Sequence, residues 1–389
     1  MHRSIVNISR IKPYPQSTTL IHCTCESPRL NHAHSLGNRT RKIEYAFDPV
    51  SIPTEKRPSD SFSFLRPERI AFHAFQHANY ITPPSVGVPW PTSFPSSLQS
   101  KYWVEVEETA RAFTQEIVER RSEVKDAKYL DAIIEAAVSM VVNTVPMGNL
   151  TRTKILAKLY VFFFLSDDVV ESRNRVTGIP SNDELQNGQG PEYTVYDMLA
   201  PAVLSEDAVQ GKRLLSSVVA WVSAMKESAP ERFLTLEDYL TYRVADFGTG
   251  AIFRSVEFAC HVSLSEADIQ AIAHLQSLCE KHFLLTNDLY SYAKEAIAEQ
   301  KHGDPVLNVV RVVQHLMNTS VTAAKAIVRQ IIWDVEHQMH HEYAHLAQNA
   351  SKSQLTYVQG LIVAVAGNMF FSATCARYAQ AVAESRLHA

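Results

Sequence analysis

The chain has 389 residues, of which 46% are hydrophobic and 20% are charged, and its formal net charge is −4. This composition is typical of a soluble protein with a large apolar core, and the weak negative charge argues against a basic nucleic-acid-binding surface. Twelve glycines are too few for a turn-rich all-β protein or a glycine-lined dinucleotide site.

Proline divides the chain, because 12 of the 18 prolines lie in residues 1–100. Helices are therefore expected mainly after residue 100. We expect a flexible or disordered extension over 1–60, followed by one domain over 61–389. An irregular arm over 43–100 is expected to carry one or two short helices around Pro67–Ala78.

Residues 1–42 contain seven basic residues and one acidic residue, with frequent serine and threonine. This composition loosely fits an organelle transit peptide. A disordered tail and a misplaced start codon are the alternatives. Because no apolar signal segment is evident, we expect a cytoplasmic protein, with organelle targeting as the alternative.

Helical periodicity continues from residue 101 to the end of the chain and predicts an all-α fold of about ten helices. The apolar run Leu361–Ala376 is short and is interrupted by polar residues, so it predicts a buried core helix and no membrane span. The expected helices are 101–124, 127–143, 150–166, 193–203, 206–227, 233–258, 264–298, 304–317, 321–348 and 352–385.

Three carboxylates follow an aromatic run near residue 164. Asp167 and Glu171 are four residues apart and share one helix face, and Asp168 lies between them. Like charges on one face are unfavourable unless a cation neutralises them. Ligands that are all oxygen favour Mg²⁺ or Mn²⁺ over zinc. Alone, the pattern also fits a solvated acidic helix end.

A second polar cluster strengthens the metal hypothesis. Asn287, Ser291 and Glu295 follow one another at four-residue intervals, so a helix aligns them on one stripe. An amide oxygen, a hydroxyl and a carboxylate form a hard oxygen site, which phosphate oxygens and water usually complete. Asp288 is expected off this stripe. The polar face of an ordinary amphipathic helix is the alternative interpretation.

Two basic features accompany the acidic clusters. Arg243 lies upstream of Asn287, and Asp246 follows it by three residues, at the spacing that would orient it. Arg377 and Tyr378 follow the last apolar helix. Arginine offers planar donors for phosphate oxygens, and tyrosine adds a hydroxyl donor.

Taken together, the D-D-x-x-E cluster, the upstream arginine, the N-D-x-x-S-x-x-K-E cluster and the late Arg-Tyr pair resemble a class I terpene cyclase of the fungal type. The resemblance covers residues 60–389 and is strongest to the cyclase domain of fungal bifunctional terpene synthases, with a fungal humulene-type sesquiterpene cyclase as the alternative closer relative. It implies an all-α bundle around a central cavity and three Mg²⁺ ions, or Mn²⁺, on a prenyl diphosphate. It also implies that homodimers are common among relatives.

The resemblance assigns roles residue by residue. The metal ligands would be Asp167, Asp168, Glu171, Asn287, Ser291 and Glu295. The diphosphate-binding residues would be Arg243, Lys294, Arg377 and Tyr378. Asp246 would link Arg243 to an effector carbonyl at a helix break, which either Phe247 or Gly248 would supply. Phe371 stands where relatives often carry tryptophan.

The reaction that the resemblance implies separates diphosphate from an allylic cation, which needs an apolar cavity that excludes water. We expect farnesyl diphosphate as substrate and a sesquiterpene as product, with geranylgeranyl diphosphate and a diterpene as the alternative. Candidate lining residues, each of which ordinary core packing also explains, are Phe163, Phe164, Leu284, Leu285, Phe370 and Phe371.

Other functions compete with cyclisation. His341-Glu342-Tyr343-Ala344-His345 matches the H-E-x-x-H zinc-protease motif, although the surrounding segment is rich in histidine and offers no third ligand at the usual spacing. Chain-elongating prenyl transfer usually carries two aspartate-rich clusters, whereas the second cluster here contains asparagine, serine and glutamate. A helical binding protein with inactive clusters is the non-catalytic alternative.

Overall fold

The structure is a computed structural model. It describes residues 40–50, 61–67, 75–121, 126–171, 195–225, 229–230, 232–303 and 306–387, with the side chains of residues 121, 167–171 and 302 outside the description. The described residues belong to one compact unit, Asn38–Ala389. The segment 40–50 is thus part of this unit, although it lies before the expected domain boundary at residue 61.

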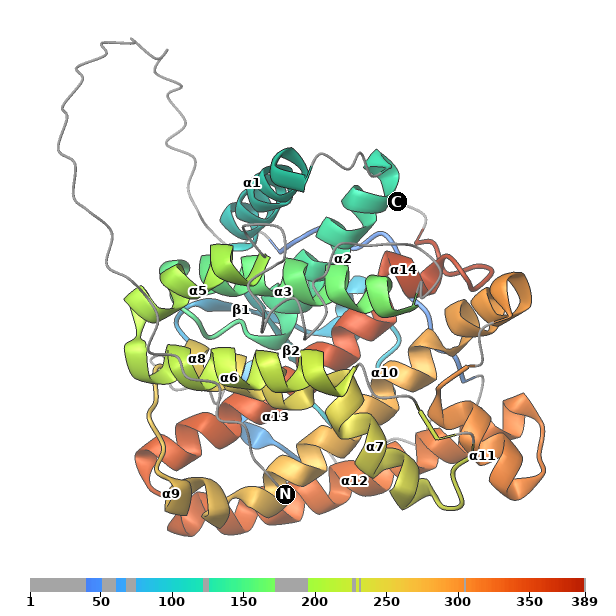
Figure 1. Ribbon diagram of the computed structural model, residues 1–389. Helices are drawn as coiled ribbons and strands as arrows, with labels where there is room; N and C mark the ends of the chain where they lie inside the picture. Colours follow the sequence, from blue (N-terminus) through green and yellow to red (C-terminus); the bar gives the residue numbers. More distant parts are fainter. Residues whose placement is uncertain are drawn as a thin grey trace, which may run out of the picture. The chain divides into compact units, whose positions relative to one another are not determined.

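The described part of the chain is mostly helical, which confirms the all-α prediction (Figure 1). Two four-residue strands that the sequence did not predict, β1 (Ala78–Ile81) and β2 (Ser97–Ser100), pair antiparallel. Residues 68–74, which include most of the predicted short helix, lie outside the described residues. The α-helices are α1 (Trp103–Arg121), α2 (Ala127–Thr144), α3 (Leu150–Glu171), α5 (Val195–Glu206), α6 (Ala208–Ala224), α7 (Leu236–Phe247), α8 (Thr249–Cys260), α9 (Glu266–Ala271), α10 (Ala273–His302), α11 (Val309–Met317), α12 (Val321–Asn349), α13 (Lys352–Thr374) and α14 (Ala376–Ala379).

Side-chain caps define several helix starts. The Ser351 hydroxyl accepts the backbone N–H of Gln354 at the start of α13, and the Gln354 side chain accepts the N–H of Ser351 in return. Thr235 and Asp238 form the same reciprocal arrangement at the start of α7. Such caps satisfy backbone donors that the first helical turn leaves unpaired.

Three of the predicted helices are interrupted. The segment 233–258 forms α7 and α8, which meet at Gly248, where φ is +79°. A β-carbon at Gly248 would lie 2.5 Å from Trp221 Cδ1, so both the backbone angle and the packing require glycine there. The segment 264–298 forms α9 and α10, and the segment 352–385 forms α13 and α14.

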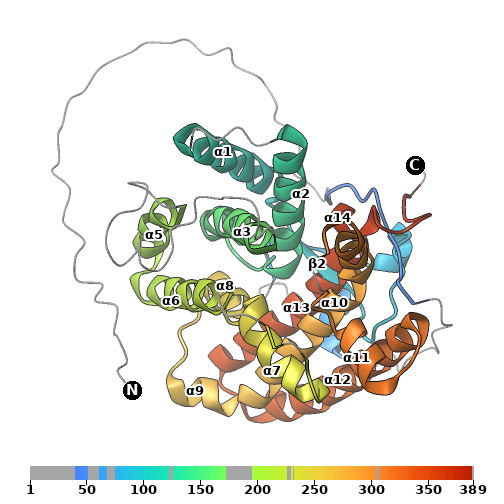
Figure 2. The same ribbon diagram turned by 45° about the vertical axis from the view of Figure 1, so that its right-hand side comes forward.

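Helix α13 is the central core helix. It packs against α2, α8 and α10, and Figures 1 and 2 show it between α2 and α10. It is long and apolar enough to cross a membrane, but 83% of its apolar window is buried inside the protein. This burial confirms the prediction of a core helix. At Gly367 an added β-carbon would lie 1.9 Å from the Asn143 carbonyl oxygen, so α13 and α2 are in backbone contact.

The two ends of the compact unit are paired with each other. The backbone of segment 44–47 bonds to segment 385–387 through Ala46 N–H to the Ser385 carbonyl at 2.8 Å and Leu387 N–H to the Glu44 carbonyl at 3.0 Å. Tyr45 and Arg386 form an isolated β-bridge. The segment 44–47 therefore holds the end of the chain that follows α14.

Candidate active site

The predicted polar stripe lies on one face of α10. Asn287 and Ser291 are buried, and Glu295 is half-buried. The Ser291 hydroxyl donates to Glu295 Oε1 at 2.6 Å, and Asn308 Nδ2 donates to Glu295 Oε2 at 3.0 Å. The three oxygen-bearing side chains predicted from their spacing thus share one buried stripe. Asn308 also caps α11, so the start of that helix fixes Glu295.

Helix α14 brings the late Arg-Tyr pair to this stripe. Asn287 Nδ2 donates to the Tyr378 hydroxyl at 2.9 Å, although the two residues are 91 positions apart. Because the amide nitrogen is used for this bond, Asn287 Oδ1 is the atom with the chemistry to bind a cation. Burial is the main cause that raises the pKa of Tyr378 well above its ordinary value, so its hydroxyl stays protonated as a donor.

Arg243 lies between two carboxylates. Its Nη1 donates to Asp246 Oδ2 at 2.5 Å, and its Nη2 donates to Asp288 Oδ1 at 3.3 Å. The contact with Asp246 is the one that the three-residue spacing predicted. Arg243 Nε is buried and has no hydrogen-bond partner within the described part of the chain, so one donor of the guanidinium is available to an anion.

Asp288, next to Asn287 on α10, accepts hydrogen bonds from neighbouring elements. It is fully buried and accepts hydrogen bonds from the Tyr239 hydroxyl and from the backbone N–H of Val309, the latter at 3.0 Å. It therefore connects α7, α10 and the start of α11. Sequence spacing predicted no role for Asp288, although Tyr239 precedes Arg243 by one helical turn on the same face.

Burial dominates the electrostatics of this cluster. It raises the pKa of Asp288, and Arg243 beside it lowers that pKa in part. Burial also raises the pKa of Glu295, and the charge of Asp288 adds to the rise. Burial alone would lower the pKa of Arg243, but Asp288, Tyr239 and Asp246 raise it well above its ordinary value. Buried carboxylates of this kind gain strongly from a neighbouring cation.

Asp288→Asn is expected to lower kcat by about 100-fold, because an arginine displaced by about an ångström no longer meets the reacting group correctly. The matched control is Tyr239→Phe, which removes a hydroxyl from Asp288 but leaves the Arg243–Asp288 pair, and its loss should be smaller. Steady-state kinetics would measure both. A wild-type kcat in Asp288→Asn would contradict the positioning role.

The helix break beside Arg243 presents three consecutive carbonyls. The Asp246 carbonyl accepts the Trp221 indole N–H at 3.0 Å, and the Gly248 carbonyl accepts the backbone N–H of Ala251 at 2.9 Å. The carbonyls of the residues before and after Phe247 therefore both accept hydrogen bonds. No sequence pattern marked Trp221, because it lies in an ordinary apolar stretch of α6.

Aromatic side chains join the end of α3 to this site. The ring of Phe164 lies 6.4 Å from that of Phe371, and the guanidinium carbon of Arg377 lies 5.9 Å from the Phe164 ring. Phe371 in turn makes an edge contact with Tyr378 at 5.8 Å. Phe163 packs instead against Trp221 at 4.9 Å. Of the two adjacent phenylalanines, Phe164 is therefore the one that approaches the Arg-Tyr pair.

The remaining predicted residues are buried in the core, half-buried on α10 or outside the described side chains. Leu284, Leu285 and Phe370 are buried, and Lys294 is half-buried on α10. The first acidic cluster occupies the end of α3, beyond Phe164, but its side chains lie outside the described residues. Its metal-binding role stays a prediction for Asp167, Asp168 and Glu171.

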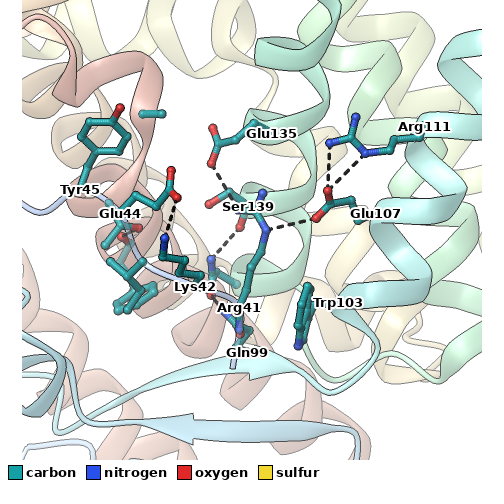
Figure 3. A pocket seen from close by; sticks show the side chains of 15 residues that line it. Arg41, Lys42, Glu44, Tyr45, Gln99, Trp103, Glu107, Arg111, Glu135 and Ser139 are labelled. Carbon is teal, nitrogen blue, oxygen red and sulfur yellow. Dashed lines mark hydrogen bonds and ion pairs between the residues drawn. The ribbon is translucent and has the colours of Figure 1, made fainter. Parts of the chain in front are cut away.

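A cavity of about 420 Å³ lies between segment 41–45 and helices α1 and α2 (Figure 3). Arg41 extends between two glutamates, with Nη1 3.2 Å from Glu135 Oε1 and Nε 3.7 Å from Glu107 Oε2. The backbone N–H of Arg41 also donates to Gln99. None of the predicted site residues except the core residue Phe370 lines this cavity, and its charged walls do not suit a hydrocarbon cation.

Comparisons with known proteins identify the family of the chain. Residues 158–338 match the family model described as Terpene synthase family 2, C-terminal metal binding. The chain is 30% identical over 367 residues to Terpene cyclase 6 of Gibberella fujikuroi, covering 87% of this chain and 95% of that protein. It is 25% identical to the aristolochene synthase of Aspergillus terreus, over 59% of this chain and 77% of that protein. The crystal structure of aristolochene synthase from Penicillium roqueforti superposes with a TM-score of 0.59 at 21% identity, covering 73% of this chain and 99% of that one.

The all-α fold and the buried oxygen stripe beside Arg243 define a class I terpene synthase. The chain belongs to the fungal terpene cyclases of terpene synthase family 2, a family with a metal-binding domain and a prenyl diphosphate substrate. The resemblance to a fungal class I terpene cyclase is therefore confirmed, and the zinc-protease and non-catalytic alternatives are set aside as the main function.

Proposed function

We propose that the protein is a magnesium-dependent sesquiterpene cyclase, which ionises farnesyl diphosphate, cyclises the cation to a humulene-type hydrocarbon and releases diphosphate. The observation that carries the proposal is the Asn287–Tyr378 contact, which joins the oxygen stripe of α10 to the Arg-Tyr pair of α14. The relatives named aristolochene synthase support the choice of the sesquiterpene class.

The residues fit a hard divalent cation. The stripe supplies one amide oxygen, one hydroxyl and one carboxylate without a nitrogen or sulfur ligand, which is the donor set that Mg²⁺ prefers, with Mn²⁺ as a substitute. Asn287, Ser291 and Glu295 would hold one ion, and Asp167 with Asp168 or Glu171 would hold the others of a set of three. These ions would neutralise the charge that develops on diphosphate.

The protein's own donors bind the leaving group. Arg243 offers its buried Nε, and Tyr378 its hydroxyl, while Arg377 and Lys294 add positive charge from α14 and α10. When the carbon–oxygen bond breaks, its electron pair leaves with diphosphate and an allylic cation remains. Fixed donors favour this charge separation because they need no reorganisation as the charge develops.

The helix break transmits the position of Arg243 to the hydrocarbon. Asp246 binds Arg243 directly and precedes Phe247 in the chain. Because the carbonyls of Asp246 and Gly248 are engaged elsewhere, Phe247 supplies the effector carbonyl in this proposal. Phe164 and Phe371 present aromatic surface to the cation and exclude water.

Incubation with C10, C15, C20 and C25 prenyl diphosphates and Mg²⁺, followed by hydrocarbon analysis, tests the proposal. We expect turnover to be at least about tenfold higher with the C15 substrate, since poorly fitting chains lose their orientation relative to the catalytic groups. Cyclic products only from the C20 substrate would replace the sesquiterpene assignment with a diterpene one. Longer prenyl diphosphates formed with added isopentenyl diphosphate would indicate chain elongation.

A cytoplasmic location and a homodimer complete the proposal. A fluorescent fusion of the full chain tests the location, and sedimentation analysis of the purified protein tests the assembly. Organelle fluorescence or a single monomeric species would contradict the respective statement.

A further inference from the structure

Three histidines of α12 form an exposed stripe that the cyclase reaction does not use. His337, His341 and His345 follow one another at four-residue intervals, and all three are exposed. His337 Nε2 and His341 Nε2 lie 3.2 Å apart, and the two ring centroids are separated by 4.5 Å. Two imidazoles on one helical face thus place their Nε2 atoms within hydrogen-bond distance of each other.

The separation of the two Nε2 atoms suits two nitrogen ligands bound to one transition-metal ion. Two nitrogens that are each about 2.05 Å from a metal and 3.2 Å from each other subtend an angle of about 103° at the metal. The angle lies between those of adjacent ligands in square-planar and tetrahedral sites. We propose that His337 and His341 form a second metal site, which binds Cu²⁺, Ni²⁺ or Zn²⁺ through both Nε2 atoms.

The geometry selects a different pair from the one in the sequence motif. The H-E-x-x-H match joins His341 to His345, whereas the close contact joins His341 to His337. Within the described ranges, no group of three or more histidine, cysteine, aspartate or glutamate residues is placed to hold a metal. The site therefore has two protein ligands, with water in the remaining positions, and it is open to solvent.

The helix that carries the pair is firmly held. Glu336, adjacent to His337, is buried and accepts the Thr92 hydroxyl at 2.6 Å and the Ser93 backbone N–H at 2.7 Å. Its Oε1 also lies 3.1 Å from His282 Nε2 on α10. These contacts fix the rotation of α12 about its axis, so both imidazoles stay on the outer face.

The chemistry of this site separates it from the oxygen stripe of α10. Imidazole nitrogen favours Cu²⁺, Ni²⁺ and Zn²⁺, whereas Mg²⁺ prefers oxygen ligands and keeps its waters. Affinity should therefore follow the order Cu²⁺ above Ni²⁺ above Co²⁺, with no binding of Mg²⁺ at this pair. The inference does not depend on the proposed cyclase function.

Isothermal titration of the untagged full-length protein with CuCl₂ or NiCl₂ alone tests the site. We compare the wild type with His337→Ala, His341→Ala, His345→Ala and, as a lone exposed histidine elsewhere, His315→Ala. The first two variants should each weaken the tightest binding event by at least about tenfold, because each leaves a single nitrogen ligand. The last two should leave it unchanged.

Two outcomes would overturn the inference. Equal affinity in His337→Ala and the wild type would show that the observed pair is not the site. If metal affinity falls in His341→Ala and His345→Ala but not in His337→Ala, the metal would belong to the H-E-x-x-H motif instead. Circular dichroism and Mg²⁺-dependent turnover should be unchanged in all four variants, so a failure here is distinct from a failure of the cyclase proposal.

Discussion

Replacing Asn287 with alanine is expected to lower kcat/KM by about 100- to 1,000-fold, because it removes a proposed ligand of an ion that would stabilise the developing anion, and loss of one such stabilising group usually costs this much. The variant loses both the amide oxygen of the proposed metal-binding stripe and the hydrogen bond to Tyr378. Because one hydrogen bond contributes only about 1 kcal/mol, the fold should survive. Steady-state kinetics and a urea titration would separate these two effects.

The matched control is Gln276→Ala on the same helix. Gln276 is likewise an amide side chain that donates a hydrogen bond, in its case to Glu280 one turn further along, but it lies outside the stripe. Its turnover should stay near that of the wild type. A second readout is the Mg²⁺ concentration needed for half-maximal rate, which should rise in Asn287→Ala. Unchanged turnover and unchanged Mg²⁺ dependence in Asn287→Ala would contradict the metal-ligand assignment.

Gly367→Ala is expected to lower the free energy of unfolding by about 3 kcal/mol or more, because overpacking costs most where the neighbour cannot move. The added carbon would lie 1.9 Å from the Asn143 carbonyl oxygen and 3.0 Å from Thr144 Cα, both of which are backbone atoms. Relief requires α13 to move away from α2. The midpoint of urea unfolding, followed by circular dichroism, measures the loss.

Gly250→Ala on α8 is the control for this substitution. An added carbon at Gly250 meets nothing within 4 Å, and the residue is exposed. This variant should be neutral or more stable by about 0.5–1 kcal/mol, since alanine favours a helix over glycine. Equal stability of Gly367→Ala and the wild type would show that the two helices are not in backbone contact.

Local spacing predicted the parts of the site that lie on single helices. The three-residue interval anticipated the Arg243–Asp246 contact, and the four-residue intervals placed Asn287, Ser291 and Glu295 on one stripe of α10. Both predictions rest on helical periodicity, which the sequence displays directly.

Contacts between distant segments could not be predicted in this way. Asp288 accepts hydrogen bonds from Tyr239, which precedes it in the sequence, and from Val309, which follows it. Trp221 on α6 donates a hydrogen bond to the Asp246 carbonyl at the helix break. Such contacts depend on how helices cross, which one sequence does not reveal. The break at Gly248 was implied by the family resemblance and had one local cue, the glycine itself, but the apolar periodicity of 233–258 runs through it without a change.

The pairing between segments 44–47 and 385–387 affects how the protein is made. During synthesis, residues near the start of the compact unit leave the ribosome long before their partners at its end exist. The segment 44–47 therefore lacks its β-bridge partner while the helices between the two segments form. Arg377 and Tyr378 precede the late partner by only a few residues, so the proposed diphosphate-binding set also depends on residues that are synthesised long after segment 44–47.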